Sequence, residues 1–202
     1  MTPRLRLFLG AGLGLLILGA AATTGLLVAY RSSEPILAAP AIGGPFALTA
    51  ADGSVVTDRS YPGKWLLVYF GYTYCPDACP TVLSNIAGAL AKLGPAADRL
   101  QVLFITVDPR RDTPKVMGDY VKAFDPRIVG LSGSPEQITA AAKAYKVYVS
   151  PHTGEGSDYL VDHSSFLYVM NPQGKFARLL SSDTPADGLA AQLRPLLDGD
   201  RS

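Results

Sequence analysis

Short apolar runs alternate with helix-like apolar spacing from about residue 45 onward. Three mainly apolar runs are typical of strands buried on both faces of a sheet. They cover residues 65–70, 100–107 and 128–131. A brief strand is predicted at 147–149. Two hairpins are predicted where apolar segments flank turn sequences. They join 46–49 to 55–57 and 166–170 to 176–180.

Apolar residues spaced three and four apart predict helices after the buried strands and at the end of the chain. Three helix-start signals support this prediction. They are Thr113 before Pro114, Ser134 with Gln137, and Thr184 before Pro185. The first helix is expected to stop at Gly94. A hairpin, a βαβ unit, a helix and a ββα unit make the thioredoxin arrangement, an α/β fold with helices on both faces of a central sheet.

The N-terminus has a different pattern. A short basic start is followed by 24 residues without a charge, at 7–30, and Arg31 closes the run. That length spans a bilayer of about 30 Å with some tilt. We expect an uncleaved anchor, although small residues near 20–22 and 38–40 resemble a signal-peptidase site. The positive-inside rule leaves the domain on the periplasmic side, or in the intermembrane space of a mitochondrion.

The expected organisation is therefore a membrane anchor at 1–31, a linker at 32–44 and one thioredoxin-like domain at 45–202. About 160 residues are enough for a single domain with a real core. The formal net charge is +1, and no basic patch stands out, so nucleic acid is not an expected partner. Two cysteines are too few to build a disulfide scaffold.

Those two cysteines, Cys75 and Cys79, follow the first buried strand directly and open the first predicted helix. Residues four apart share one helix face, so both sulfurs can point at one spot. They can close a disulfide or bind one soft metal ion. The positive end of the helix favours thiolate over thiol.

His163 is the candidate third donor. It lies just before the predicted strand at 166–170, and if that strand runs antiparallel beside 65–70, its start lies next to the cysteines. The alternative is a loop histidine bonded to Asp162 or to the backbone. His152 lies in a Gly-rich loop and is expected to face solvent. Met117 and Met170 fall on predicted core faces and are interpreted as packing.

Two thiolates and one imidazole make a soft donor set. Thiolates favour Cu(I), and imidazole suits copper in either oxidation state. Structural zinc usually takes four ligands. The residues therefore indicate copper rather than zinc.

Three motifs in order resemble the Sco/SenC family of membrane-anchored copper proteins. They are Gly-Tyr-Thr-Tyr-Cys-Pro-Asp-Ala-Cys-Pro at 71–80, Val-Asp-Pro-Arg-Arg-Asp-Thr-Pro at 107–114 and Val-Asp-His-Ser-Ser at 161–165. The resemblance covers roughly 42–197 and includes the anchor. It implies Cys75, Cys79 and His163 as ligands of Cu(I) and Cu(II), and a reversible Cys75–Cys79 disulfide. Tyr74 stands where many members carry histidine, a position outside the three ligands.

The resemblance also implies a function. Family members help to assemble the binuclear copper site of cytochrome c oxidase, as copper donors, as reductants of the target cysteines, or as both. The implied partners are the copper-site subunit of that oxidase, another copper carrier and a thiol reductase. This is the work of a metallochaperone rather than of a conventional enzyme.

Four acidic and basic residues near the motifs have two interpretations each. Asp77 either tunes the thiolates or is an acid at a helix start. Asp108 either supports a site at the carboxyl edge of the sheet or forms a turn before Pro109. Arg110 and Arg111 either dock an acidic partner or belong to a solvated face.

Two other functions compete with copper delivery. One is a thiol–disulfide oxidoreductase without an obligatory metal, although such enzymes use Cys-x-x-Cys and this spacing has one residue more. The other is a thiol peroxidase of the same fold, although those carry Thr-x-x-Cys and here Thr73 lies two residues before Cys75.

Overall fold

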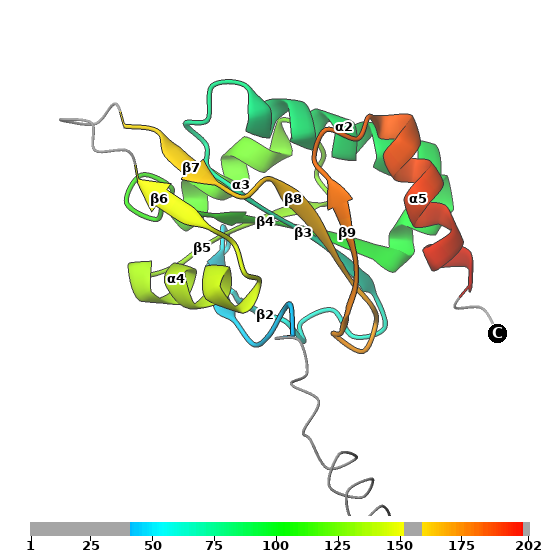
Figure 1. The fold of residues 1–202 in the computed structure, drawn as a ribbon, viewed down its shortest axis with the longest axis horizontal. Helices are drawn as coiled ribbons and strands as arrows, with labels where there is room; N and C mark the ends of the chain where they lie inside the picture. Colours follow the sequence, from blue (N-terminus) through cyan, green and yellow to red (C-terminus); the bar gives the residue numbers. More distant parts are fainter. Residues whose placement is uncertain (1–40, 152–158, 200–202) are drawn as a thin grey trace, which may run out of the picture. The chain divides into compact units, whose positions relative to one another are not determined.

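The computed structural model describes residues 41–151 and 159–199, which belong to one compact unit (Figure 1). The strands are β1 (Ala47–Ala50), β2 (Val55–Thr57), β3 (Trp65–Gly71), β4 (Leu100–Thr106), β5 (Ile128–Ser132), β6 (Val149–Pro151), β7 (Val161–His163), β8 (Phe166–Met170) and β9 (Phe176–Ser181). The helices are α2 (Ala78–Leu93), a 3₁₀ turn η1 (Gly94–Arg99), α3 (Pro114–Lys122), α4 (Pro135–Ala144) and α5 (Ala186–Gly199).

Seven strands form the central sheet in the order β2-β1-β5-β4-β3-β8-β9. The three mainly apolar runs became its middle, where β3, β4 and β5 lie parallel. Every residue of β4 is buried, as an apolar strand covered on both faces requires. The antiparallel pairs lie toward the edges. A separate two-stranded ribbon joins β6 to β7.

The core is divided into two layers by the sheet. One layer packs α2, α3 and α5 against the face that carries Leu67 and Tyr69. The other packs α4 against the face that carries Val68 and Phe70, to which the β1–β2 hairpin contributes Phe46, Leu48, Ala50 and Val56. Figure 1 shows α2 and α3 on the side of the sheet opposite to α4. The predicted α/β fold, with helices on both faces, is confirmed.

Local chemistry explains the helix boundaries. The Thr113 side chain accepts the Val116 backbone N–H at the start of α3. Ser134 and Gln137 form a reciprocal capping box at the start of α4. Gly94 ends α2 with φ of +58°, a conformation that side chains other than glycine rarely adopt.

The predicted strand pairing that matters for the site is also confirmed. β8 runs antiparallel to β3, with Tyr69 opposite Leu167. The sequence predicted no strand in the segment directly before β8. Residues 161–163 form β7, and His163 pairs with Val149 of β6.

In the part of the chain that the structure describes, no helix has the length and apolarity needed to span a bilayer. The predicted anchor at 1–31 and most of the predicted linker lie outside the described residues.

Candidate metal centre

The two cysteines lie where β3 turns into α2. β3 ends at Gly71, and the chain turns before α2 begins at Ala78. Cys79 is fully buried, and Cys75 is half-buried at the surface. A Cβ at Gly71 would lie 2.7 Å from the Cys79 Sγ and 2.7 Å from a ring carbon of Phe104. Glycine is therefore required for the strand end to pass this close to the thiol.

The start of α2 polarises the exposed sulfur. The backbone N–H of Cys79 donates to Cys75 Sγ at 3.4 Å. Asp77 occupies the N-cap position, but its side chain caps nothing and is exposed. The sulfur of Cys75 thus takes the place that a capping oxygen usually fills.

These contacts separate the two thiols chemically. A hydrogen bond from the Cys79 thiol, together with backbone N–H groups at the helix start, lowers the pKa of Cys75 to about 5. The same hydrogen bond and burial raise the pKa of Cys79. In this structure both residues are free thiols. Cys75 is the accessible nucleophilic sulfur, and Cys79 is the buried, protonated one.

His163 comes to this pair from 84 residues along the chain. Its Nε2 lies 3.9 Å from Cys79 Sγ. Its Nδ1 lies 3.1 Å from the carbonyl oxygen of Ser164, and a carbonyl can only accept a hydrogen bond. Nδ1 therefore carries a proton, and in the neutral imidazole the lone pair is on Nε2, the atom that faces the sulfur. The backbone bond of the alternative interpretation is present, and it fixes the tautomer that a metal ligand would need, so it is compatible with the ligand interpretation.

Two buried tyrosines complete the surroundings. The Tyr69 hydroxyl donates to Cys79 Sγ at 3.6 Å. The rings of Tyr69 and Tyr72 stand edge-on to the His163 ring, with centroids 6.4 and 6.1 Å away. Sequence reasoning missed both tyrosines. Only the alternation of β3, which points Tyr69 to the face covered by α2, would have indicated the first.

The acidic candidates have other partners. Asp108 is buried and pairs with Arg111, and it also accepts the hydroxyl of Tyr159 at 2.6 Å. Arg111 is neither a docking residue nor part of a solvated face, because its side chain is only 12% exposed. Asp112, which the sequence did not single out, is fully buried and accepts the backbone N–H and the hydroxyl of Thr73.

The remaining sulfur atoms of the described residues lie elsewhere. Met117 and Met170 are buried in the core, so their interpretation as packing is confirmed. His152 lies outside the described residues.

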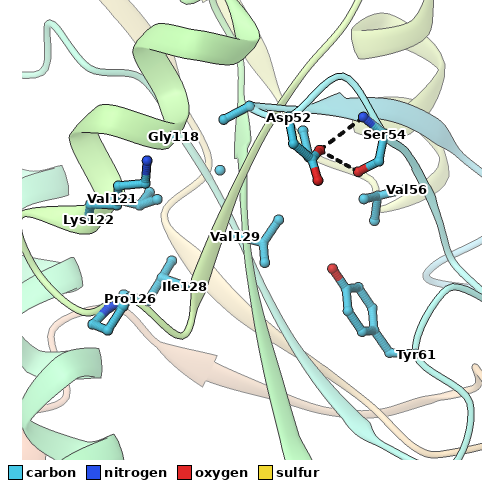
Figure 2. Close-up of a pocket in the computed structure, with 13 residues that line it drawn as sticks. Asp52, Ser54, Val56, Tyr61, Gly118, Val121, Lys122, Pro126, Ile128 and Val129 are labelled. Atoms are coloured by element: carbon cyan, nitrogen blue, oxygen red, sulfur yellow. Dashed lines mark hydrogen bonds between the residues drawn. The ribbon is translucent and has the colours of Figure 1, made fainter.

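A pocket of about 390 Å³ lies away from the thiols, between the β1–β2 turn, α3 and β5 (Figure 2). Its lining includes apolar side chains such as Val56 and Ile128 and polar ones such as Asp52 and Ser54. Asp52 accepts the backbone N–H and the hydroxyl of Ser54 (Figure 2). Neither cysteine nor His163 lines this pocket.

The donor set fits a soft metal ion. Two sulfurs and one imidazole nitrogen with a free lone pair are the ligands that Cu(I) prefers. Within the described ranges, no three His, Cys, Asp or Glu side chains already form a metal-binding cluster. The three donors are neighbours that would have to draw together around an ion.

The fold and the site place this chain in the class of thioredoxin-like proteins that have a dithiol at the start of a helix, here with an imidazole beside it. The chain belongs to the SCO1/SenC family, which matches residues 35–198.

Three similar proteins illustrate the relationship. Protein SCO1 homolog 1, mitochondrial, of Arabidopsis thaliana is 44% identical over 160 residues, covering 76% of this chain and 48% of the relative. Protein SCO1 homolog, mitochondrial, of Homo sapiens is 40% identical over 157 residues, covering 76% and 52%. The structure of Bradyrhizobium japonicum ScoI with copper bound is 42% identical with a TM-score of 0.72, covering 77% of this chain and 99% of that one. The chain spans about half the length of the two curated relatives.

Proposed function

We propose that this protein is a copper metallochaperone that binds one Cu(I) or Cu(II) ion through Cys75, Cys79 and His163 and helps to assemble the binuclear copper site of cytochrome c oxidase. The observation that carries the proposal is the approach of the His163 Nε2 lone pair to within 3.9 Å of Cys79 Sγ, beside a second free thiol. Similar structures described as copper-bound support it.

The difference in burial and pKa between the two cysteines supports transfer of copper by ligand exchange. Cys75 is half-buried with a low pKa, so it is deprotonated at neutral pH and ready to bind the ion. Cys79 and His163 come from different elements and hold the ion from the protein side. A partner thiolate would reach the copper ion first on the exposed Cys75 side. Copper is the cargo in this scheme and leaves with the partner.

The proposed setting follows from the N-terminal sequence and the relatives. A helix at 7–30 would anchor the chain, with the domain on the periplasmic side or in the intermembrane space. The two curated relatives are named as mitochondrial proteins. The proposed partners are the copper-site subunit of the oxidase, a second copper carrier and a thiol reductase. The reductase is needed because a Cys75–Cys79 disulfide, favoured in an oxidising compartment, offers no thiolates to copper.

The asymmetry of the thiols also favours a second candidate, a thiol–disulfide oxidoreductase that reduces the cysteines of its target. An exposed thiol with a pKa of about 5 beside a buried partner is the arrangement of an attacking and a resolving cysteine. Nothing comparable favours a thiol peroxidase, since the Thr73 hydroxyl donates to Asp112 at 2.5 Å instead of facing Cys75.

Copper stoichiometry and affinity of the reduced protein test the proposal. We expect one tightly bound Cu(I) per chain, and loss of tight binding in Cys75→Ser, Cys79→Ser and His163→Ala. His152→Ala is the matched control, because it removes the other histidine of the chain, and should bind as the wild type does. Full affinity in His163→Ala would exclude the three-ligand site. Turnover of a disulfide substrate by copper-free protein would favour the second candidate.

A further inference from the structure

The turn between β4 and α3 contacts both the cysteine turn and the segment that leads to His163. It contains Asp108 and Arg111, which form an ion pair. Asp108 is only 3% exposed, and its backbone N–H donates to the Thr106 hydroxyl at 2.9 Å, so the carboxylate is held firmly at the end of β4. The turn therefore offers a rigid, buried charge pair near the cysteine turn.

Three aromatic rings surround the Arg111 guanidinium. Its central carbon lies 3.8 Å from the ring centroid of Tyr159, 4.5 Å from that of Tyr74 and 5.8 Å from that of Tyr72. Tyr72 and Tyr74 belong to the cysteine turn, and Tyr159 belongs to the segment that leads into β7. A planar guanidinium stacks on such rings, and an ammonium group cannot do so equally well.

The segment that leads to His163 is fixed at two points. The Tyr159 hydroxyl donates to Asp108 Oδ1 at 2.6 Å. The Val161 backbone N–H donates to the Tyr72 hydroxyl at 3.3 Å. His163 follows two residues later. β7 pairs only with β6 in a ribbon outside the central sheet, and an isolated two-stranded ribbon is marginally stable. Contacts made outside the ribbon therefore decide where β7 lies.

We propose that Asp108 and Arg111 form a clamp that positions His163 against Cys79, by gripping Tyr159 on one side and the cysteine turn on the other. This inference rests on the proposed function for its purpose, but the clamp exists without copper. The contacts of this pair connect Tyr74 of the cysteine turn to Tyr159, and these two residues are far apart in sequence. The pair therefore links the nitrogen donor to the sulfur donors before any ion binds. Asp108 and Arg111 are positioning residues, since neither touches the three donors.

Tyr159→Phe is the sharpest perturbation. It removes the hydroxyl that donates to the Asp108 carboxylate and keeps the ring that lies on Arg111. Tyr74→Phe is the matched control, because its ring also stacks on Arg111 but the residue is 59% exposed. One lost buried hydrogen bond corresponds to about a fivefold change in an opening equilibrium.

The first measurement is backbone hydrogen exchange in the reduced, copper-free protein. We expect exchange at residues 161–163 to accelerate about fivefold in Tyr159→Phe, with the amides of β3 and β4 unchanged. Tyr74→Phe should exchange as the wild type does. Unchanged exchange at 161–163, or equal acceleration throughout the central sheet, would overturn the clamp.

The second measurement is Cu(I) affinity together with the Cu(II) absorption and EPR spectra. We expect Tyr159→Phe to weaken copper binding about fivefold and to alter the spectra, and Arg111→Lys to do the same because it keeps the charge and loses the stacking. Wild-type spectra and affinity in both variants would refute the positioning role. If the wild type binds no copper, the proposed function fails, and the exchange experiment still decides whether the clamp exists.

Discussion

The hydroxyl of Tyr69 provides a direct test of how the buried thiol is held. Tyr69 is fully buried on β3, and its hydroxyl donates to Cys79 Sγ at 3.6 Å. A thiol or thiolate accepts this hydrogen bond better than a disulfide sulfur does. The bond therefore stabilises the reduced pair over the Cys75–Cys79 disulfide, and Tyr69→Phe should make the pair harder to reduce.

The magnitude follows from the burial of the group. A buried neutral hydrogen bond contributes about 1 kcal/mol net, which is about fivefold in an equilibrium constant. For a two-electron couple, a fivefold change is about 20 mV. We therefore expect the reduction potential of the pair to become about 20 mV more negative in Tyr69→Phe, as measured by equilibration of the copper-free protein with glutathione buffers.

Tyr168→Phe is the control for the loss of a buried hydroxyl. Tyr168 is 3% exposed on the neighbouring strand β8, but it packs in the other core layer, against Phe70 and Tyr145. The reduction potential of the cysteine pair in Tyr168→Phe should equal that of the wild type. An unchanged or more positive potential in Tyr69→Phe, or an equal shift in both variants, would refute the claim that this hydroxyl stabilises the reduced thiol.

Three further predictions concern stability, measured as the free energy of unfolding in urea. Gly71→Ala places a Cβ 2.7 Å from Cys79 Sγ, so we expect a loss of about 1–3 kcal/mol, and an unchanged midpoint would contradict the close approach. Ser134→Ala removes the capping box of α4 and should cost about 1 kcal/mol; no loss would mean that the cap is redundant. The Arg127 side chain lowers the pKa of Asp125 below its ordinary value of 3.8, so the pair stabilises the fold above that pH. That contribution, under about 1 kcal/mol for a partly exposed pair, should disappear as the pH falls through the lowered pKa. The free energy of unfolding of Asp125→Asn should lack this part of the decrease at low pH. Identical pH profiles of stability in the variant and the wild type would contradict this prediction.

Local patterns predicted most of the fold because they depend on near neighbours. Runs of buried apolar residues became β3, β4 and β5, and the capping signals at Thr113 and Ser134 mark real helix starts. β7 escaped prediction because a three-residue strand in a small ribbon has too few residues to show a period.

The sequence by itself determined the donor types and their order. Cys75 and Cys79 lie four residues apart at a strand-to-helix turn, and His163 precedes a predicted strand; that this strand pairs with β3 came from the structure. Residue type and spacing also indicated a soft ion, because those features do not depend on distant contacts.

Only the tertiary structure decided how the donors are held. It turned the His163 Nε2 lone pair toward Cys79, separated the pKa values of the two thiols, and left Asp77 without a capping bond. It also buried Arg111 among aromatic rings from two distant segments. The physical reason is that burial, hydrogen-bond direction and stacking arise between groups that the fold brings together, and no local period in the sequence encodes those contacts.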